Sequence, residues 1–475
     1  MPQPRPRPGT GPVAYAADRL FDGQVVLADH AIVVDGGAVT AVLPRRRVPR
    51  AWPVSTEPET TIIPGLIDVH AHLMRWEAPL WLAYGVTTVR DVGNELAWVL
   101  AQRAHAEDAA SPTVLCVGPL LDGPQPGHPI VSRSCADRAA AIAAVRETAA
   151  AGVDGIKLYC GLPRAWLPSM VAEAHRAGLK ASMHCLADGV LVAGRAGVDE
   201  FFHLDGLLAD VWPDHPPGWL SVWGLPGWAE TREQQHRVAD EIRALGLTAT
   251  PTLVYWDSQW RLRDAGFAAP QDAAHVPPQM VEWQRAPSRD TEAAGQWRRA
   301  LHAAQHFTGL LLDRGVPVLA GSDVPFGAVT PGLGLWREMS LLVGSGMSPL
   351  QALRAATADA AAFLGRPQLG RLSPGSRLLV GQVARPAGTV GPRVWRPAPP
   401  APSTRTRNRW PRPGGQHGPS ATTPGPCSSS STVRPTAALP TRYHGRARRR
   451  HRVVARREAS RRRCLSTPGR MGGSR

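Results

Sequence analysis

The sequence has 475 residues and a formal net charge of +16, long enough for one large α/β barrel and a smaller domain. The charge is localised. Residues 381–475 hold 21 arginines and one acidic residue, Glu458, whereas the rest holds 33 basic and 37 acidic residues. The part expected to fold is therefore slightly acidic, which argues against a nucleic-acid-binding protein with a basic globular surface.

The six cysteines show no Cys-x-x-Cys spacing, so neither a zinc finger nor a disulfide framework is indicated. The first twelve residues are rich in proline and arginine and lack the apolar core of a secretory signal. No uninterrupted apolar run reaches the ~18 residues that a membrane helix needs. These features predict a cytoplasmic protein without membrane contact.

Near the N-terminus, residues 31–34 and 38–42 are apolar runs separated by Asp35-Gly36-Gly37, which predicts a β-hairpin. A two-stranded hairpin is too small to be stable alone, so we expect it to pair with other parts of the chain.

From residue 61 to about 364, apolar β-branched runs alternate with Ala-rich helical stretches, which predicts a (β/α)8 barrel. A doubly wound sheet is the alternative, but its Gly-x-Gly-x-x-Gly turn is absent. The eight expected strands are 61–69, 86–90, 113–117, 153–159, 180–184, 198–203, 248–254 and 316–322.

Two insertions, 205–229 and 255–292, follow the sixth and seventh expected strands and hold seven of the sixteen tryptophans. Loops after strands line the active-site face of a barrel, so these segments are interpreted as a lid or pocket wall. Packing of two long loops onto the barrel explains them equally well. Residues 332–364 predict two amphipathic helices, with Pro349 in the first turn of the second and Ser348 as its N-cap.

Two histidines, His70 and His72, end the first expected barrel strand. Residues i and i+2 of a strand point to the same face, so both imidazoles can approach one metal ion. Such a pair alone is more often a pair of core histidines than a metal site. The other strand ends decide between these interpretations.

The fourth expected strand contains Lys157, one of two lysines in the chain. A lysine within an apolar strand costs free energy unless it is paired with a carboxylate or neutral. A buried, neutral amine can add carbon dioxide, and the resulting carbamate is an anionic ligand that can bridge two cations. We favour this interpretation over a structural ion pair.

Three further strands each end in one metal-binding side chain, namely His184, His203 and Asp323. Packing alone explains such a coincidence poorly. Together with His70, His72 and carboxylated Lys157, these side chains predict a site for two divalent metal ions. Zinc is the first expectation, with manganese and iron left open.

Other candidates near the predicted site are weaker. Two residues are candidates for substrate binding: His128, in the loop after the third strand, and Tyr159, two residues after Lys157. A surface position for His128 and a structural role for Tyr159 are the alternatives. Arg90 and Asp91 end the second strand and are expected to form an ion pair with each other.

Five segments of the chain form a recognisable set: Pro-Gly-Leu-Ile-Asp-Val-His-Ala-His at 64–72, Gly-Val-Thr-Thr-Val-Arg-Asp-Val-Gly at 85–93, Gly-Ile-Lys-Leu-Tyr at 155–159, Ala-Gly-Ser-Asp-Val-Pro at 320–325 and Gly-Met-Ser-Pro-Leu-Gln-Ala-Leu-Arg-Ala-Ala-Thr at 346–357. Together they resemble the metal-dependent amidohydrolase superfamily, in particular the imidazolonepropionase-like branch that includes metallo-dipeptidases.

The resemblance implies metal ions at the C-terminal mouth of the barrel. His70, His72 and Asp323 would hold the more buried ion, His184 and His203 the other, and carboxylated Lys157 would bridge them. It also implies a small β-sandwich built from both ends of the chain. The expected limits are 13–60 for the N-terminal part of the sandwich, 61–365 for the barrel, 366–385 for the sandwich remnant and 386–475 for a tail.

The sequence departs from this pattern after Gly370-Arg371-Leu372-Ser373-Pro374-Gly375-Ser376-Arg377. A Pro- and Arg-rich segment follows there, in place of the strand of alternating apolar residues that relatives have. We interpret the change as a reading-frame shift near 377–385. By composition, residues 390–475 are expected to be disordered.

The predicted activity is hydrolysis of an amide, peptide-like or cyclic amide C–N bond by a metal-bridging hydroxide, with Asp323 transferring the proton. The substrate is a small molecule whose identity the sequence does not give, and the oligomeric state is left open. Two alternatives remain: an inactive or unstable barrel with a truncated sandwich, and nucleic-acid binding through the basic tail.

Overall fold

The computed structural model describes residues 11–376 and the short strand 383–384, apart from residues 75, 109–110, 129, 217–219, 265–289 and 327–328. The expected tail at 386–475 and most of the expected frame-shift region lie outside these residues, as does most of the insertion predicted at 255–292. Within the described residues, no helix combines the length and apolar character needed to cross a lipid bilayer.

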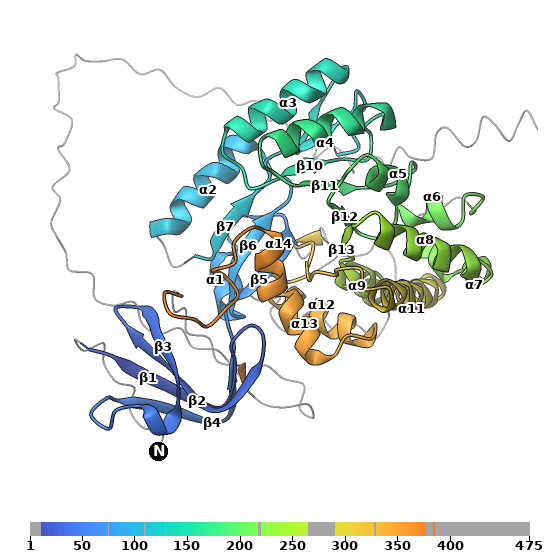
Figure 1. Cartoon of the computed structure of the whole chain (residues 1–475). Helices are drawn as coiled ribbons and strands as arrows, with labels where there is room; N and C mark the ends of the chain where they lie inside the picture. The colour runs from blue at the N-terminus through green and yellow to red at the C-terminus, as the bar shows by residue number, and fades with distance from the viewer. Residues whose placement is uncertain are drawn as a thin grey trace, which may run out of the picture. The chain divides into compact units, whose positions relative to one another are not determined.

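A five-stranded sheet contains the N-terminal strands in the order β14-β4-β1-β2-β3 (Figure 1). Its strands are β1(Val13–Phe21), β2(Val26–Asp35), β3(Ala38–Pro44), β4(Val54–Ile62) and β14(Val383–Ala384). The hairpin prediction is confirmed: β2 and β3 pair antiparallel around Gly36 and Gly37, whose positive φ angles suit the tight turn.

The expected partners of the hairpin come from both ends of the described chain. The Leu372 N–H donates to the Asp22 carbonyl at 3.0 Å, and the Gly375 N–H donates to the Val39 carbonyl at 2.8 Å. Leu372 packs with Leu20, Ile32 and other buried residues of the sheet. The complete sandwich stays a prediction.

The remaining strands are parallel and form a TIM-barrel-like α/β arrangement. One sheet has the order β5-β6-β7 and the other the order β13-β12-β11-β10-β8-β9. Their bounds are β5(Leu66–Ala71), β6(Val86–Asp91), β7(Thr113–Cys116), β8(Leu120–Asp122), β9(Ser132–Ser134), β10(Ile156–Leu158), β11(Ala181–His184), β12(Glu200–Phe202) and β13(Thr248–Thr250).

The expected eighth strand, 316–322, is not a regular strand. Single parallel bridges join Val318 to Ala249 of β13, and Val324 to Ala71 of β5. The backbone carbonyls at the end of the helix Pro349–Ala355 provide the reason. The carbonyl of Ala355 accepts the N–H of Ala320, and the carbonyl of Ala356 accepts the N–H of Ile67. These carbonyls take two N–H groups that a regular ladder could use, although Val69, His72 and Asp323 still donate backbone hydrogen bonds between the two segments.

The helices follow the expected alternation with the strands. They are α1(Ala78–Ala83), α2(Leu96–Asp108), α3(Arg138–Ala150), α4(Leu167–Arg176), α5(Val190–Arg195), α6(Leu207–Val211), α7(Pro226–Ala229), α8(Arg232–Ala244), α9(Leu253–Arg263), α11(Thr291–Asp313), α12(Leu333–Gly344), α13(Pro349–Ala355) and α14(Ala358–Phe363). The N-cap prediction is confirmed, since Ser348 and Gln351 form a capping box at α13.

Two predictions about the later segments are corrected. Residues 332–364 contain three helices rather than two, because Thr357 has a non-helical backbone between α13 and α14. The start of the insertion predicted at 255–292 is helical, since α9 continues to Arg263. Trp223, Trp228 and Trp256 are almost fully buried, and the first two rings stack at 3.9 Å. These tryptophans therefore pack into the core, in agreement with the interpretation that the insertions pack onto the barrel.

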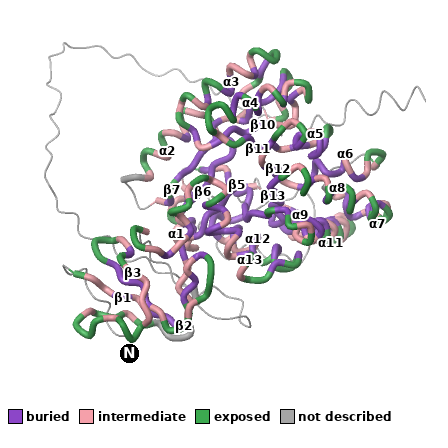
Figure 2. Tube along the Cα trace, in the orientation of Figure 1, coloured by how far each residue is buried: buried purple, intermediate pink, exposed green. Residues whose placement is uncertain are grey.

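The alternation of side chains along the strands places polar groups inside the barrel-like sheet. In β5, Ile67 and Val69 pack against Leu319 and the alanines of α14, so Asp68 and His70 point to the opposite face. All residues of β5 are buried, and the tube in Figure 2 is largely purple around this strand. The inner face of β5 therefore carries two polar side chains, Asp68 and His70, that are fully buried.

Candidate metal centre

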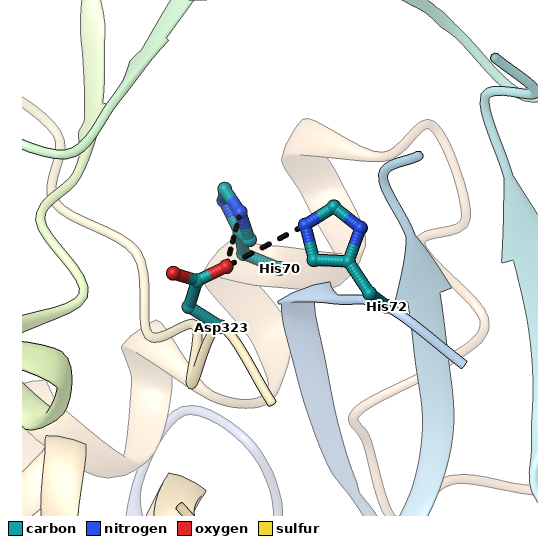
Figure 3. A group of neighbouring side chains, drawn as sticks. All are labelled: His70, His72 and Asp323. Atoms are coloured by element: carbon teal, nitrogen blue, oxygen red, sulfur yellow. Dashed lines mark ion pairs between the residues drawn. The ribbon is translucent and has the colours of Figure 1, made fainter. Parts of the chain in front are cut away.

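Three side chains that are far apart in the sequence meet at the carboxyl end of β5: His70, His72 and Asp323 (Figure 3). Their candidate ligand atoms lie within 4.8 Å of one another. The His70 Nε2 is 3.2 Å from Asp323 Oδ1, and the His72 Nε2 is 3.5 Å from the same oxygen. Two imidazole nitrogens and a carboxylate oxygen aimed at one point are a typical ligand set for zinc and similar ions.

His70 provides the clearest test of whether a metal ion fits here. Its side chain is fully buried, and neither ring nitrogen makes a hydrogen bond of good geometry among the described residues. Burial lowers the pKa of His70 well below its ordinary value, with Lys157 the next cause. A neutral buried imidazole without hydrogen bonds is costly as a structural group, but suited to ligate a metal ion.

The orientation of His72 is fixed by the loop after β6. Its Nδ1 lies 3.0 Å from the Gly93 carbonyl oxygen, so Nδ1–H donates there and the lone pair of Nε2 faces Asp323. A Cβ at position 93 would lie 3.0 Å from the His72 Cε1, so glycine permits this approach. Asp91 joins this loop to the loop after β5 by accepting the N–H groups of Gly93 and Leu73.

The ion pair expected between Arg90 and Asp91 is wrong. Consecutive strand residues point to opposite faces, so the two side chains diverge. The Arg90 Nη2 instead lies 2.7 Å from Glu200 Oε2, and both side chains are almost fully buried. Glu200 also accepts hydrogen bonds from Ser182 and Thr250, which satisfies this buried carboxylate within the barrel interior.

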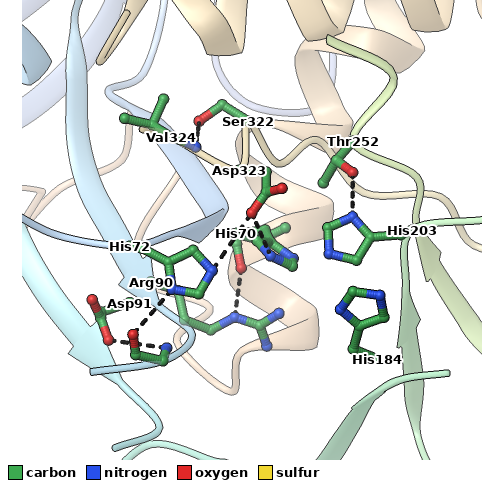
Figure 4. Close-up of polar contacts among 12 residues, drawn as sticks. His70, His72, Arg90, Asp91, His184, His203, Thr252, Ser322, Asp323 and Val324 are labelled. Atoms are coloured by element: carbon green, nitrogen blue, oxygen red, sulfur yellow. Dashed lines mark hydrogen bonds and ion pairs between the residues drawn. The ribbon is translucent and has the colours of Figure 1, made fainter. Parts of the chain in front are cut away.

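A second pair of imidazoles lies beside the first. The ring centroids of His184 and His203 are 4.4 Å apart, and the His203 ring is 4.8 Å from that of His70 (Figure 4). Each ring has one nitrogen in a hydrogen bond: His184 Nε2 to Asp205 Oδ2 at 2.9 Å, and His203 Nδ1 to Thr252 Oγ1 at 2.6 Å. The other nitrogen of each ring is then the one that can bind a metal ion.

Lys157 is nearly completely buried inside the barrel. Among the described residues it makes no ion pair within 4 Å, and its Nζ lies 3.7 Å from the centroid of the Phe202 ring. Burial lowers the pKa of Lys157 to about 7, opposed by the nearby carboxylates of Asp323 and Glu200. A large fraction of this amine is therefore neutral at physiological pH.

Three residues at the mouth carry positive φ angles that side-chain-bearing residues rarely adopt: His203, Thr252 and Asp323. Each one directly follows, or lies within a few residues of, the end of a barrel strand. The Asp323 backbone is held there by its N–H, which donates to the His70 carbonyl at 2.7 Å. Such backbone strain clusters at functional sites because it re-aims side chains out of the strand register.

The two candidate substrate-binding residues lie at the rim of this cluster. The His128 Nδ1 is buried without a hydrogen-bond partner among the described residues, and burial lowers the pKa of His128, with His72 the next cause. The Tyr159 ring lies 5.1 Å from that of His184. Sequence reasoning missed Asp205 and Thr252. Asp205 lies two residues beyond the predicted strand 198–203, whereas Thr252 lies within the predicted strand 248–254 but two residues beyond the observed end of β13.

The sequence model of the amidohydrolase family matches residues 61–377. No curated protein matches the chain. Among solved structures, bottromycin amidohydrolase is 25% identical with a TM-score of 0.59, covering 76% of this chain and 80% of that chain. A Xaa-Pro dipeptidase with bound methionine (19% identity, TM-score 0.56, 77% and 92% coverage) and a putative prolidase from Bifidobacterium longum (23%, 0.56, 78% and 88%) also match.

The chain therefore belongs to the amidohydrolase family. It is an enzyme of the class that hydrolyses carbon–nitrogen bonds.

Proposed function

We propose that this protein is a hydrolase dependent on two divalent metal ions, zinc in the first instance, that cleaves an amide, peptide-like or cyclic amide bond. The observation that carries the proposal is His70, a fully buried imidazole that makes no hydrogen bond with the described residues, faces Asp323 and lies beside His72. Divalent metal ions are general in the amidohydrolase family, which supports the same assignment.

In this proposal His70, His72 and Asp323 would hold one ion and His184 and His203 the other, and carboxylated Lys157 would supply an anionic ligand to both. The neutral Lys157 amine adds to carbon dioxide, forming an N–C bond and releasing one proton. Bound divalent ions would lower the pKa of a water molecule towards 7 and polarise the carbonyl of the substrate.

The chain's own groups then carry the proton transfer and the orientation of the substrate. Asp323 accepts the proton of the attacking water and delivers it to the leaving nitrogen. His128 and Tyr159 bind the substrate beside the reacting carbonyl. The unpartnered Nδ1 of His128 supports this role, because it needs a hydrogen-bond partner that the described residues do not supply.

The proposed substrates are dipeptides or N-acyl amino acids, as in the metallo-dipeptidase branch of the family. The likeness to a Xaa-Pro dipeptidase, a putative prolidase and bottromycin amidohydrolase supports this class.

Metal analysis of the purified protein, combined with a substrate panel, tests the proposal. The panel holds dipeptides, N-acyl amino acids, cyclic amides and lactones. We expect bound divalent metal, turnover of at least one amide, and loss of turnover after chelation that the same metal restores. Turnover that survives complete metal removal, or turnover of lactones alone, would contradict it.

A further inference from the structure

Asp122 ends β8 and is fully buried, yet its partners are backbone groups from two different loops. Its Oδ1 accepts the N–H of Gly123 at 2.9 Å and that of Gly161 at 2.8 Å, and its Oδ2 accepts the N–H of Gly127 at 2.6 Å. Gly127 lies in the loop after β8, whereas Gly161 lies in the loop after β10. The one carboxylate therefore joins the two loops.

The two loops approach so closely that side chains are excluded between them. A Cβ at Gly123 would lie 2.0 Å from the Gly161 carbonyl oxygen, and a Cβ at Gly161 would lie 2.5 Å from Asp122 Oδ1. The Tyr159 N–H also donates to the Leu121 carbonyl at 2.9 Å. Backbone contact of this kind transmits the position of one loop directly to the other.

Each loop carries one of the two proposed substrate-binding side chains. His128 directly follows Gly127, and Tyr159 precedes Gly161 by two residues. The two loops also meet at Tyr159, since a Cβ at Gly127 would lie 3.2 Å from the Tyr159 Cε1. A movement of either loop would therefore displace both side chains from the candidate metal centre.

We propose that Asp122 is a positioning residue that holds His128 and Tyr159 together as one substrate-binding unit. This inference rests on the proposed function, because it presumes that those two side chains contact the substrate. Asp122 is not one of the proposed metal ligands or substrate-binding residues. A carboxylate is required because it offers acceptor oxygens alone, while an amide would turn an N–H donor toward a backbone N–H.

The test is the isosteric substitution Asp122→Asn, with Asp137→Asn as the matched control. Asp137 is an exposed N-cap that accepts the Ala140 N–H at 2.8 Å, and asparagine caps a helix about equally well. We expect Asp122→Asn to lower kcat/KM about 10- to 100-fold at unchanged metal content, because small misplacements near a reacting centre have effects of this size. The control should retain wild-type kcat/KM.

A double-mutant cycle separates positioning from general damage. In a protein that already carries His128→Asn and Tyr159→Phe, adding Asp122→Asn should cost less than threefold, since the groups it positions are gone. A further loss as large as in the wild-type background would overturn the proposal, because Asp122 would then act independently of both side chains.

Hydrogen exchange tests the contact without any substrate. The Gly127 and Gly161 amides should both exchange faster in Asp122→Asn, and neither should change in Asp137→Asn. Unchanged exchange at either amide in Asp122→Asn would overturn the proposal whatever the activity. A wild-type protein that binds no metal and cleaves no substrate would instead contradict the proposed function, while the exchange result still decides whether Asp122 joins the loops.

Discussion

At the scale of single residues, three of the four imidazoles at the candidate metal centre use one ring nitrogen to fix the direction of the other. His72 uses the Gly93 carbonyl, His184 the Asp205 carboxylate and His203 the Thr252 hydroxyl. His70 makes no such bond and is instead enclosed by its neighbours, with the Phe202 ring 4.3 Å from its own. Packing and hydrogen bonding therefore orient the imidazoles before any ion is present.

Asp323→Asn tests the proposed proton transfer. The amide keeps an oxygen that can face His70 and His72 but has no basicity to accept a proton, so metal content should be retained. We expect kcat to fall by roughly 10²- to 10⁴-fold, the usual size of a general acid–base contribution. Elemental analysis and steady-state kinetics on the same sample measure both quantities, and near-normal kcat would refute the assigned role.

Lys157→Ala tests the proposed bridging ligand. Removal of the only strand lysine should abolish binding of at least one metal ion, because two cations close together need an anionic ligand between them. The chain offers a matched control in Lys180, its only other lysine, which is half-exposed and faces Asp199 at 3.8 Å. Lys180→Ala should bind metal normally; wild-type metal stoichiometry in Lys157→Ala would rule out the bridge.

Residue types at strand ends could be predicted because a strand's two-residue alternation fixes which side chains share a face. His70 with His72, and Lys157 as a buried lysine, follow from that rule. The partners of those residues could not be predicted in the same way. Asp205 reaches His184 only through the backbone of the segment after β12, and Arg90 finds Glu200 across the barrel interior, 110 positions away.

At the scale of elements, α9 begins at the mouth of the barrel and α12 holds its start. Glu338, in α12, is fully buried, and its Oε2 accepts the N–H of Val254 at 2.7 Å. Thr252, which pairs with His203, directly precedes α9. Glu338 therefore satisfies a free N–H of the first turn of a helix whose start adjoins a candidate metal ligand.

The buried Glu338 makes stability depend on pH. Burial raises the pKa of Glu338 from 4.5 to about 8. The native state therefore keeps this proton up to about pH 8, whereas the unfolded chain releases it near pH 4.5. The contribution of Glu338 to stability is present below pH 4.5 and is lost as the pH rises to 8, by at most about 1.4 kcal/mol for each pH unit.

Glu338→Gln should weaken that pH dependence. We expect the free energy of unfolding, measured by urea titration at pH 5 and pH 8, to differ less between the two conditions in the variant than in the wild type. The exposed carboxyl of Glu233 in α8 provides the control substitution Glu233→Gln. A pH difference in Glu338→Gln that equals the wild-type difference would contradict the assignment.

Helices and strands could be predicted where the hydrophobic pattern kept a regular period. The prediction failed where contacts with distant parts of the chain decided the local structure. Helices such as α3 and α11 lie in the stretches between the expected strands, as the alternation predicts. The eighth strand, 316–322, has a strand-like sequence, but the carbonyls of Ala355 and Ala356 take N–H groups that a ladder would use. No local pattern reveals a competitor for hydrogen bonds that lies more than thirty positions away.

At the scale of the whole chain, the small sheet and the barrel-like region follow each other along the sequence with only a short connection between them. β4 ends at Ile62 and β5 begins at Leu66, so the predicted run 61–69 spans both units. We retain as proposals the limits 13–60, 61–365, 366–385 and 386–475. The return of the chain at Leu372, Gly375 and Ser376 to the small sheet supports the third of these limits.

Deletion of residues 390–475 tests the basic tail as a separate property. The deletion removes most of the arginine excess, so any salt-dependent binding to nucleic acid should disappear. Metal content and kcat should stay at their full-length values, because all six proposed ligands lie before residue 324. Nucleic-acid binding that survives the deletion would contradict this account, as would loss of bound metal in a folded, truncated protein.

The central claim is that six side chains from five segments of the barrel-like region surround a pair of divalent ions. The most direct test is elemental analysis of the purified wild-type protein after equilibration with zinc and removal of free metal. We predict two zinc ions for each chain and fewer in His70→Ala. A folded wild-type protein that retains no zinc, manganese or iron would contradict the claim.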